Sequence, residues 1–448
     1  MRQLNIPKNQ LGIRAGLLTG LAFLVGFARF PALGGEDIGQ ARANYLEANP
    51  IDFWGGTSTL FYGNFPSIFG LNWESSLVIL QILMSLVGLL IINARFAERS
   101  KVQFSVFLVI SYICLVFASY GTRDGILFSS LLLGISLLVG KDKNQKNSDK
   151  KRILLATSFL IIGLAFRPWV SICLLPPLLY FLRVNIKNAS IFKDKTAIIL
   201  SICVALGPIS LELFVQNSLN LRHSFPQQQV MIMDLTSNYC WGTQRNSNLI
   251  SRDALRIFTG DDEMDSTICQ FFRADTWVSL TNNGNTSATG MQSHFRLIAP
   301  DQRASYEKVF HAWLKIILMD PVTYLQNKSI FATKVLIGSD MRGFRVTQAS
   351  SPHTLLQGIL LLPYDFIITF HLMSIGTVLL VLLIACCFKR IPYKSAAKIG
   401  ILMCLLWLIT TTVAYIGSNG RYTYTVSLLA ILLLIHSREL EGKDARHE

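Results

Sequence analysis

Apolar residues form long continuous blocks along this chain, without the alternation of sheet strands. The blocks fall at roughly 12–28, 75–94, 103–119, 125–140, 153–166, 169–182, 196–214, 366–388, 399–417 and 423–437. A helix needs about 20 apolar residues to cross the hydrocarbon core of a bilayer. Because lipid offers the backbone no hydrogen-bond partners, such blocks must be helices, whereas barrel strands would alternate. The pattern therefore predicts an all-α polytopic membrane protein with about ten transmembrane helices.

Composition and charge support this interpretation. Of 448 residues, 51% are hydrophobic and 15% are charged, whereas soluble domains carry about a quarter charged residues. The net charge of +14 does not indicate a nucleic-acid partner, because the basic residues cluster between apolar blocks. By the positive-inside rule, these clusters mark the cytoplasmic side and place both termini there. They are Arg2, Lys8 and Arg14; Arg95, Arg99 and Lys101; Lys141, Lys143, Lys146, Lys150, Lys151 and Arg152; Arg183, Lys187, Lys193 and Lys195; Lys389, Arg390, Lys394 and Lys398; and Arg438, Lys443 and Arg446.

This topology divides the chain into three parts. Residues 1–214 form an N-terminal module of seven spans, with an outer loop at 29–73. Residues 215–365 form the one larger extracytoplasmic domain, and 366–448 form a module of three spans with a cytoplasmic tail. Arg167-Pro168 interrupts one apolar stretch, which we interpret as two helices that meet at the outer surface. A single kinked helix is the alternative and would invert the topology downstream.

Local signals also predict structure within the extracytoplasmic domain. An amphipathic helix is expected over 303–319, because apolar residues recur there at helical spacing. Asp320-Pro321 then supplies an N-cap and a first-turn proline for a second helix through Leu336. Both helices are expected on or near the membrane surface. Cys240 and Cys269 are the two cysteines of this domain, and an oxidising exterior would permit a disulfide between them.

Two acids follow the first span directly. Glu36 and Asp37 come after two glycines, at the start of the first outer loop. An ordinary structural role would be for Asp37 to cap a short surface helix that starts at Ile38. The functional alternative is a carboxylate at the membrane surface that acts as a general base toward an acceptor hydroxyl.

Three arginines lie in very short outward turns. Arg123-Asp124 stands between the third and fourth spans, Arg167 stands in FRPW, and Arg421-Tyr422 precedes the last span. Any one of them could reach a lipid phosphate as a snorkelling surface residue. Three such arginines beside an outer carboxylate favour a binding site, because guanidinium groups hold phosphate in a bidentate, permanently charged way.

Other polar residues give weaker signals. The acidic run Asp261, Asp262, Glu263 and Asp265 has the oxygen ligands of a divalent-cation site, but it lacks EF-hand spacing and a solvated loop is favoured. No residue pattern requires a cofactor or metal. Asp234 has two interpretations, as a substrate contact beside a catalytic cavity or as a turn residue. Glu212 and His371 are the main ionisable residues inside the spans.

At this point the layout resembles the GT-C superfamily of integral-membrane glycosyltransferases, which use lipid-phosphate-linked sugars. The acid after the first span and the Arg167-Pro168 break are similar to features of that superfamily. The segment AWLKIILMDPVTYLQNK, with Trp313, Pro321 and Tyr324, is similar to an outer helical segment before its last spans. RYTYTVSLLAILLL, with Arg421 and Tyr422, is similar to its final helix. The likeness covers most of the chain as architecture, through short motifs.

The resemblance implies an inverting transfer of a sugar from a polyprenyl-phosphate donor, outside the inner (cytoplasmic) membrane. Asp37 would be the base, and Arg123, Arg167 and Arg421 would hold the donor phosphate. Many relatives have Asp-Glu or a lone Asp where this chain has Glu-Asp, so Glu36 is the alternative base. Asp124, Tyr422 and Asp234 are further candidate substrate contacts. The implied partners are the lipid-linked donor, membrane lipids and a glycan, lipid or protein acceptor of the cell envelope.

Two other classes of protein remain open. An O-antigen polymerase or ligase would share the outward arginines and a large late outer loop, and GTRDGILFSSLLL is similar to the short arginine motif of those proteins. Such a protein needs no acid after the first span. A transporter or flippase would show a two-fold repeat and polar residues at mid-membrane, and the sequence has neither pattern. A non-catalytic assembly or sensor protein is a further alternative.

Overall fold

The computed structural model describes residues 8–30, 36–47, 50–51, 55–67, 70–95, 101–139, 146–168, 194–222, 225, 227–259, 268–269, 272–273, 295, 298–299, 301–337, 355–387, 394–414 and 425–432. Within these ranges the regular structure is helical, and one isolated bridge joins Ile51 to Arg222. The prediction of an all-α protein is therefore confirmed.

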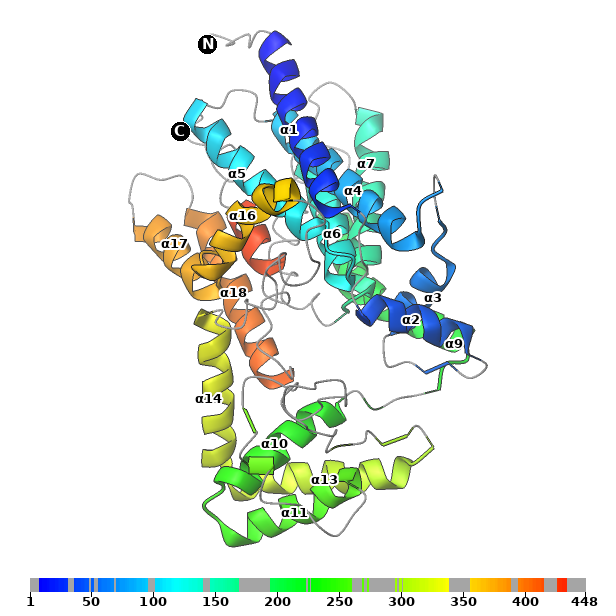
Figure 1. The fold of residues 1–448 in the computed structure, drawn as a ribbon, viewed down its shortest axis with the longest axis vertical. Helices are drawn as coiled ribbons and strands as arrows, with labels where there is room; N and C mark the ends of the chain where they lie inside the picture. The colour runs from blue at the N-terminus through cyan, green and yellow to red at the C-terminus, as the bar shows by residue number, and fades with distance from the viewer. Residues whose placement is uncertain are drawn as a thin grey trace.

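Six helices form the N-terminal bundle in the upper part of Figure 1. They are α1 (Lys8–Arg29), α4 (Trp73–Arg95), α5 (Lys101–Ala118), α6 (Arg123–Val139), α7 (Lys146–Ala165) and α9 (Asp194–Ser218). Each contains most of an apolar block expected from the sequence. Helix α7 ends at Ala165, so the helix stops before Arg167-Pro168 as expected. The span expected at 169–182 lies outside the described residues.

Helices α4, α6 and α7 pack closely through small polar and glycine positions. Ser85 of α4 donates to Ser129 of α6 across 3.1 Å. Gly134 of α6 lies so close to α7 that a β-carbon there would approach Leu160. Small residues let helix backbones approach in this way, and the packing is typical of helices that associate in lipid.

Two described helices are long and apolar enough to cross a membrane, Gln10–Arg29 and Trp73–Ala94. Five further apolar helices are shorter: Phe104–Ala118, Ile202–Ser218, Leu355–Thr369, Ile375–Cys387 and Ala397–Thr412. Residues 425–432 are helical and belong to the last expected span. Length and composition thus support membrane association through two helices, and the count of about ten spans remains a prediction.

The C-terminal helices are α16 (Leu355–Thr369), α17 (Ile375–Cys387) and α18 (Lys394–Ala414). The sequence predicts one span at 366–388, whereas the chain turns after Thr369 and His371 has φ +54°. The expected boundary at 365 therefore falls inside α16, which packs against α1 and α5. Asp365, the residue at that boundary, is buried in the structure.

A separate layer of helices lies at the lower end of Figure 1, and we call it the helical layer. It consists of α10 (Gln228–Trp241), α11 (Arg245–Thr259), α13 (Arg303–Met319) and the first half of α14 (Pro321–Ile337). These helices enclose their own core, which includes Met231, Leu255, Phe258, Val309 and Ile316.

The two helices expected in this region are present. Helix α13 has the predicted bounds, and Asp320 accepts hydrogen bonds from the backbone N–H and the hydroxyl of Thr323 (3.2 and 2.9 Å), so it caps α14. Their expected position on or near the membrane surface stays a prediction, and α14 extends beyond the helical layer. That helix runs from the helical layer to α17 and α18 and connects the two parts (Figure 1).

Candidate functional site

The candidate site lies at one end of the bundle. At this end α5 and α7 finish and α6 begins. The turn from α5 to α6 is held at both sides. Thr122 caps α6 by accepting the N–H of Gly125 (3.2 Å). In the amide orientation that satisfies both of its polar atoms, Gln81 of α4 donates to the carbonyls of Ala118 and Tyr120 (2.8 and 2.9 Å). Arg123 and Asp124 are therefore fixed as the first two residues of α6.

Arg167 and Asp124 form a buried ion pair. The Nε of Arg167 lies 3.2 Å from Oδ1 of Asp124, and its Nη2 lies 3.4 Å from Oδ2. The two side chains are only 10% and 5% exposed. Two parallel bonds between a guanidinium and a carboxylate are among the strongest polar contacts in proteins. The pair ties the end of α7 to the start of α6 and joins two residues that the sequence had singled out separately.

The acidic segment after the first span forms helix α2 (Glu36–Leu46). The helix begins at Glu36, so Asp37 lies in its first turn and is not the cap of a helix that starts at Ile38. One turn further along, Ala41 is fully buried. It belongs to one apolar cluster with Phe166, beside Arg167, and Ile126, beside the start of α6. The fold therefore brings α2 to the same end of the bundle as the ion pair.

A second polar cluster at this end was not predicted from the sequence. The buried guanidinium of Arg29, at the end of α1, lies 4.9 Å from the centre of the Tyr120 ring. The Tyr120 ring faces Tyr364 of α16 at 6.2 Å between centres. Asp365, also buried, lies close enough to act on the Arg29 charge. The sequence contained one signal for this cluster, an acid inside the apolar run 355–369. It did not show which residue is the partner of that acid.

Helix α16 reaches this cluster through three hydrogen bonds to neighbouring helices. Gln357 donates to the carbonyls of Phe27 and Phe30 (3.1 and 2.7 Å) at the end of α1. Tyr112 of α5 donates to the carbonyl of Leu360 (2.8 Å). These contacts fix α16 against the end of α1 and place its tyrosine and acid beside Arg29.

Asp234 lies elsewhere, in the core of the helical layer. Its carboxylate accepts from Trp313 Nε1 (3.0 Å), Asn327 Nδ2 (2.9 Å) and Lys328 Nζ (2.9 Å). Burial raises the pKa of Asp234, and Lys328 opposes that rise with its positive charge. The described partners of this side chain come from α13 and α14, so the carboxylate joins helices of the layer. This geometry favours a structural role over the substrate contact suggested by the sequence.

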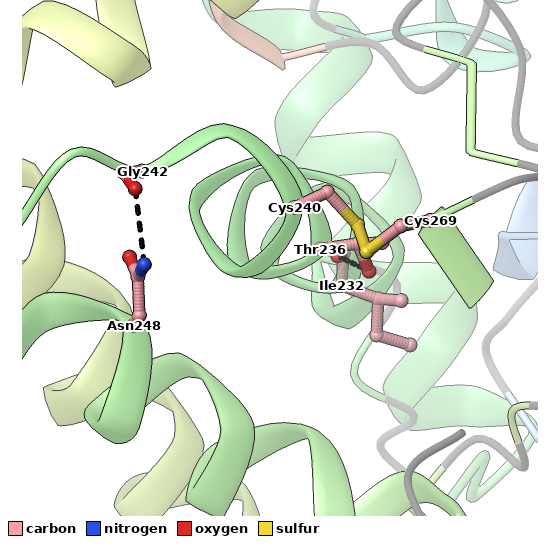
Figure 2. The surroundings of a disulfide bond; sticks show 6 residues. All are labelled: Ile232, Thr236, Cys240, Gly242, Asn248 and Cys269. Carbon is pink, nitrogen blue, oxygen red and sulfur yellow. Dashed lines mark hydrogen bonds between the residues drawn. A yellow bond between two sulfur atoms is a disulfide. The ribbon is translucent and has the colours of Figure 1, made fainter. Parts of the chain in front are cut away.

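Cys240 and Cys269 form a disulfide in the helical layer, with their α-carbons 5.3 Å apart (Figure 2). Cys240 lies at the end of α10, where Thr236 donates to the carbonyl of Ile232 (2.7 Å). Just beyond, Asn248 donates to the carbonyl of Gly242 (3.0 Å) and joins the start of α11 to the end of α10. The disulfide connects α10 to the segment before α13.

The remaining candidates fall outside the described residues. Arg421 and Tyr422 precede the described helical segment 425–432, and nothing places their side chains relative to the ion pair. The acidic run Asp261, Asp262, Glu263 and Asp265 is likewise outside. The described part of the site therefore consists of α2, the start of α6, the end of α7 and the Arg29 cluster.

Comparison of the chain with protein-family models, with curated proteins and with solved structures finds no match.

Proposed function

We propose that this protein is a polytopic membrane glycosyltransferase that moves a sugar from a polyprenyl-phosphate donor to an acceptor of the cell envelope. In this proposal about ten helices cross the inner membrane, both termini are cytoplasmic, and the site faces the exterior. The acceptor is a glycan, a lipid or a protein. The helical layer, with its disulfide, then lies in an oxidising compartment, which suits the bond.

One observation carries the proposal. Three segments that are far apart in the sequence meet at one end of the bundle: the acidic helix α2, the Arg123-Asp124 start of α6 and the Arg167 turn. Ala41, Ile126 and Phe166 of these segments share one buried apolar cluster. A transferase that uses a charged lipid donor needs a base and phosphate-binding cations at one membrane surface, and the proposal is supported because these segments bring both residue types to one end of the bundle.

The chemistry assigns a role to each group. Asp37, or Glu36 beside it, accepts the proton of the acceptor hydroxyl, and the hydroxyl oxygen then attacks the anomeric carbon. The bond from that carbon to the phosphate oxygen breaks, and the phosphate leaves with the electron pair. Arg123, Arg167 and Arg421 neutralise the charge that develops on the leaving phosphate. Arg123 begins α6, so the N-terminal end of the helix dipole adds to that stabilisation.

Arg167 has a second task in this scheme, because it already pairs with Asp124. The pair fixes the start of α6 and hence the position of Arg123. Arg123 is therefore the leading candidate for direct contact with the donor phosphate, and Arg167 acts partly through Asp124.

The test is sugar transfer from a labelled polyprenyl-phosphate donor in membranes that contain Asp37→Asn, Glu36→Gln or both changes. Loss of a general base should lower kcat at least about 100-fold in the variant of the true base. Glu47→Gln changes an exposed acid just after α2 and is the matched control. Full activity in both single variants would refute the base assignment. An O-antigen polymerase or ligase needs no acid here, so the same result separates the two classes.

A further inference from the structure

Helix α3 (Gly56–Asn64), which follows α2 in the chain, depends on other helices for both of its ends. It has nine residues, GTSTLFYGN, without a charged side chain. A helix this short is marginal alone, and its terminal N–H and C=O groups lack partners within the helix. The residue before it, Gly55, has no side chain that could cap it.

Glu212 of α9 supplies the missing cap at the N-terminus. Its Oε1 accepts the N–H of Gly56, and its Oε2 accepts the N–H of Thr57 at 2.9 Å. The carboxylate is buried, and Gln216 of α9 donates to it at 2.8 Å. Gly55 has φ +84°, and a β-carbon there would meet Glu212 Oε1 at 3.0 Å. A glycine is therefore needed for the chain to turn this close to the carboxylate.

Arg42 of α2 supplies the partner at the C-terminus of α3. Its Nη1 donates to the carbonyls of Tyr62 (3.2 Å) and Phe65 (3.0 Å). Its guanidinium also lies 4.8 Å from the centre of the Trp73 ring, at the start of α4. A cation at this end and an anion at the other both complement the dipole of an uncharged helix.

Helix α3 in turn holds α2. Gly63 faces the ring of Tyr45, and the approach is so close that a β-carbon at this position would overlap the ring. The hydroxyl of Tyr45 donates to Asn64 at 3.2 Å. Arg42 and Tyr45 lie about one turn apart on the same face of α2, so α3 is attached to the C-terminal half of the acidic helix.

We propose that Glu212 and Arg42 are positioning residues, and that they clamp α3 so that α3 holds the first turn of α2 at the end of the bundle. This inference rests on the proposed function, because the group being positioned is the base in that turn. Glu212 is 155 residues from Thr57 in sequence, so the clamp connects the first outer segment to α9. A small displacement of a catalytic group lowers the rate of the chemical step more than it weakens substrate binding.

The first measurement is steady-state sugar transfer by full-length Glu212→Gln, with Glu307→Gln as a matched control on an exposed acid of α13. Glutamine keeps the size and one acceptor oxygen but loses the charge. We expect kcat to fall about tenfold while KM for the donor stays within about twofold. In an Asp37→Asn background the same change should cost almost nothing further, because the clamp acts through the base. Unchanged kcat, or full additivity of the two changes, overturns the proposal.

The second measurement is amide hydrogen exchange across 36–64, and it is independent of catalysis. Exchange should be faster in Glu212→Gln than in Glu307→Gln, in α2 as well as α3, because the clamp is released. If wild-type protein transfers no sugar from any polyprenyl-phosphate donor, the proposed function fails, and exchange alone decides the clamp. Unchanged exchange overturns it. Should Glu212→Gln not fold, Arg42→Lys replaces it, since lysine keeps the charge but loses the planar donors.

Discussion

Two buried ion pairs, one in each part of the molecule, differ in how their carboxylates are satisfied. In the helical layer, Asp234 receives an indole N–H, an amide N–H and the ammonium of Lys328. At the end of the bundle, Asp124 receives two parallel bonds from Arg167 and stands in the first turn of α6. The first carboxylate is bound by side chains of two helices, α13 and α14, and the second also meets the positive end of a helix dipole.

The difference indicates that the Asp234 pair has a structural role, whereas the Asp124 pair also positions a residue of the candidate site. Asp234 connects α10 to α13 and α14 inside an apolar core, and every described donor belongs to the layer itself. Asp124 is adjacent to Arg123, so its pair with Arg167 fixes an arginine at the surface of the candidate site. Loss of the layer pair should therefore destabilise the fold, whereas loss of the bundle pair should also change the proposed sugar transfer.

The largest expected effect is that of Lys328→Met. This change leaves Asp234 buried and without its cation, which costs about 3–5 kcal/mol for a buried pair. The melting temperature of the purified protein in detergent should fall accordingly, with loss of the Trp313 fluorescence signal of the folded layer. The double variant Asp234→Asn with Lys328→Met should regain most of the loss, because no charge remains buried. A Lys328→Met protein as stable as wild type would contradict the role of the pair.

A smaller loss is expected from Arg167→Met in the bundle. The dipole of α6 partly stabilises the unpaired Asp124, so the cost should be up to about 2 kcal/mol below that of Lys328→Met. The double variant Asp124→Asn with Arg167→Gln should recover stability, yet sugar transfer should stay at least about tenfold reduced with a raised donor KM. Normal transfer by this double variant would show that Arg167 serves only as the partner of Asp124.

The smallest expected effect is a pH dependence of the layer. Burial raises the pKa of Asp234 in the folded state above its pKa in the unfolded state. At a pH between these two pKa values, the folded state holds a proton that the unfolded state lacks. The free energy of unfolding then falls as pH rises through that window. Relative to Asp234→Asn, wild type should become more stable as the pH is lowered through that window. Melting curves that stay parallel over pH would contradict this, and Asp253→Asn, an exposed acid of α11, is the control.

Features set by neighbouring residues could be predicted from the sequence. The apolar blocks gave the helices of the bundle, and the bounds of α13 and the cap at Asp320-Pro321 followed from local periodicity and capping. The pairing of Cys240 with Cys269 was suggested by compartment and not by geometry. The helix and cap signals lie within a few turns of the residues that they describe, so they can be found in a single sequence.

Features that depend on distant partners could not be predicted. Glu212 was noticed as an acid in an apolar helix, but the backbone groups that it caps lie 155 and 156 residues away. Asp124 and Arg167 were each singled out, and their pairing over 43 residues was not. An acid such as Asp365 in an apolar run is costly without a partner, but the sequence does not show what that partner is. Only the fold reveals that Arg29 is nearby.

Helix α14 makes the two parts of the molecule mechanically dependent on each other. In the first half of α14, Lys328 and Asn327 bind Asp234 of the layer. In its last turn, the carbonyl of Leu336 lies close to Gly376 of α17. At 1.5 Å per residue the helix is a stiff rod of about 25 Å. A tilt of about 5° at its bundle end would swing the layer end by about 2 Å, given that length. A displacement of the layer would therefore also change the contact between α14 and α17.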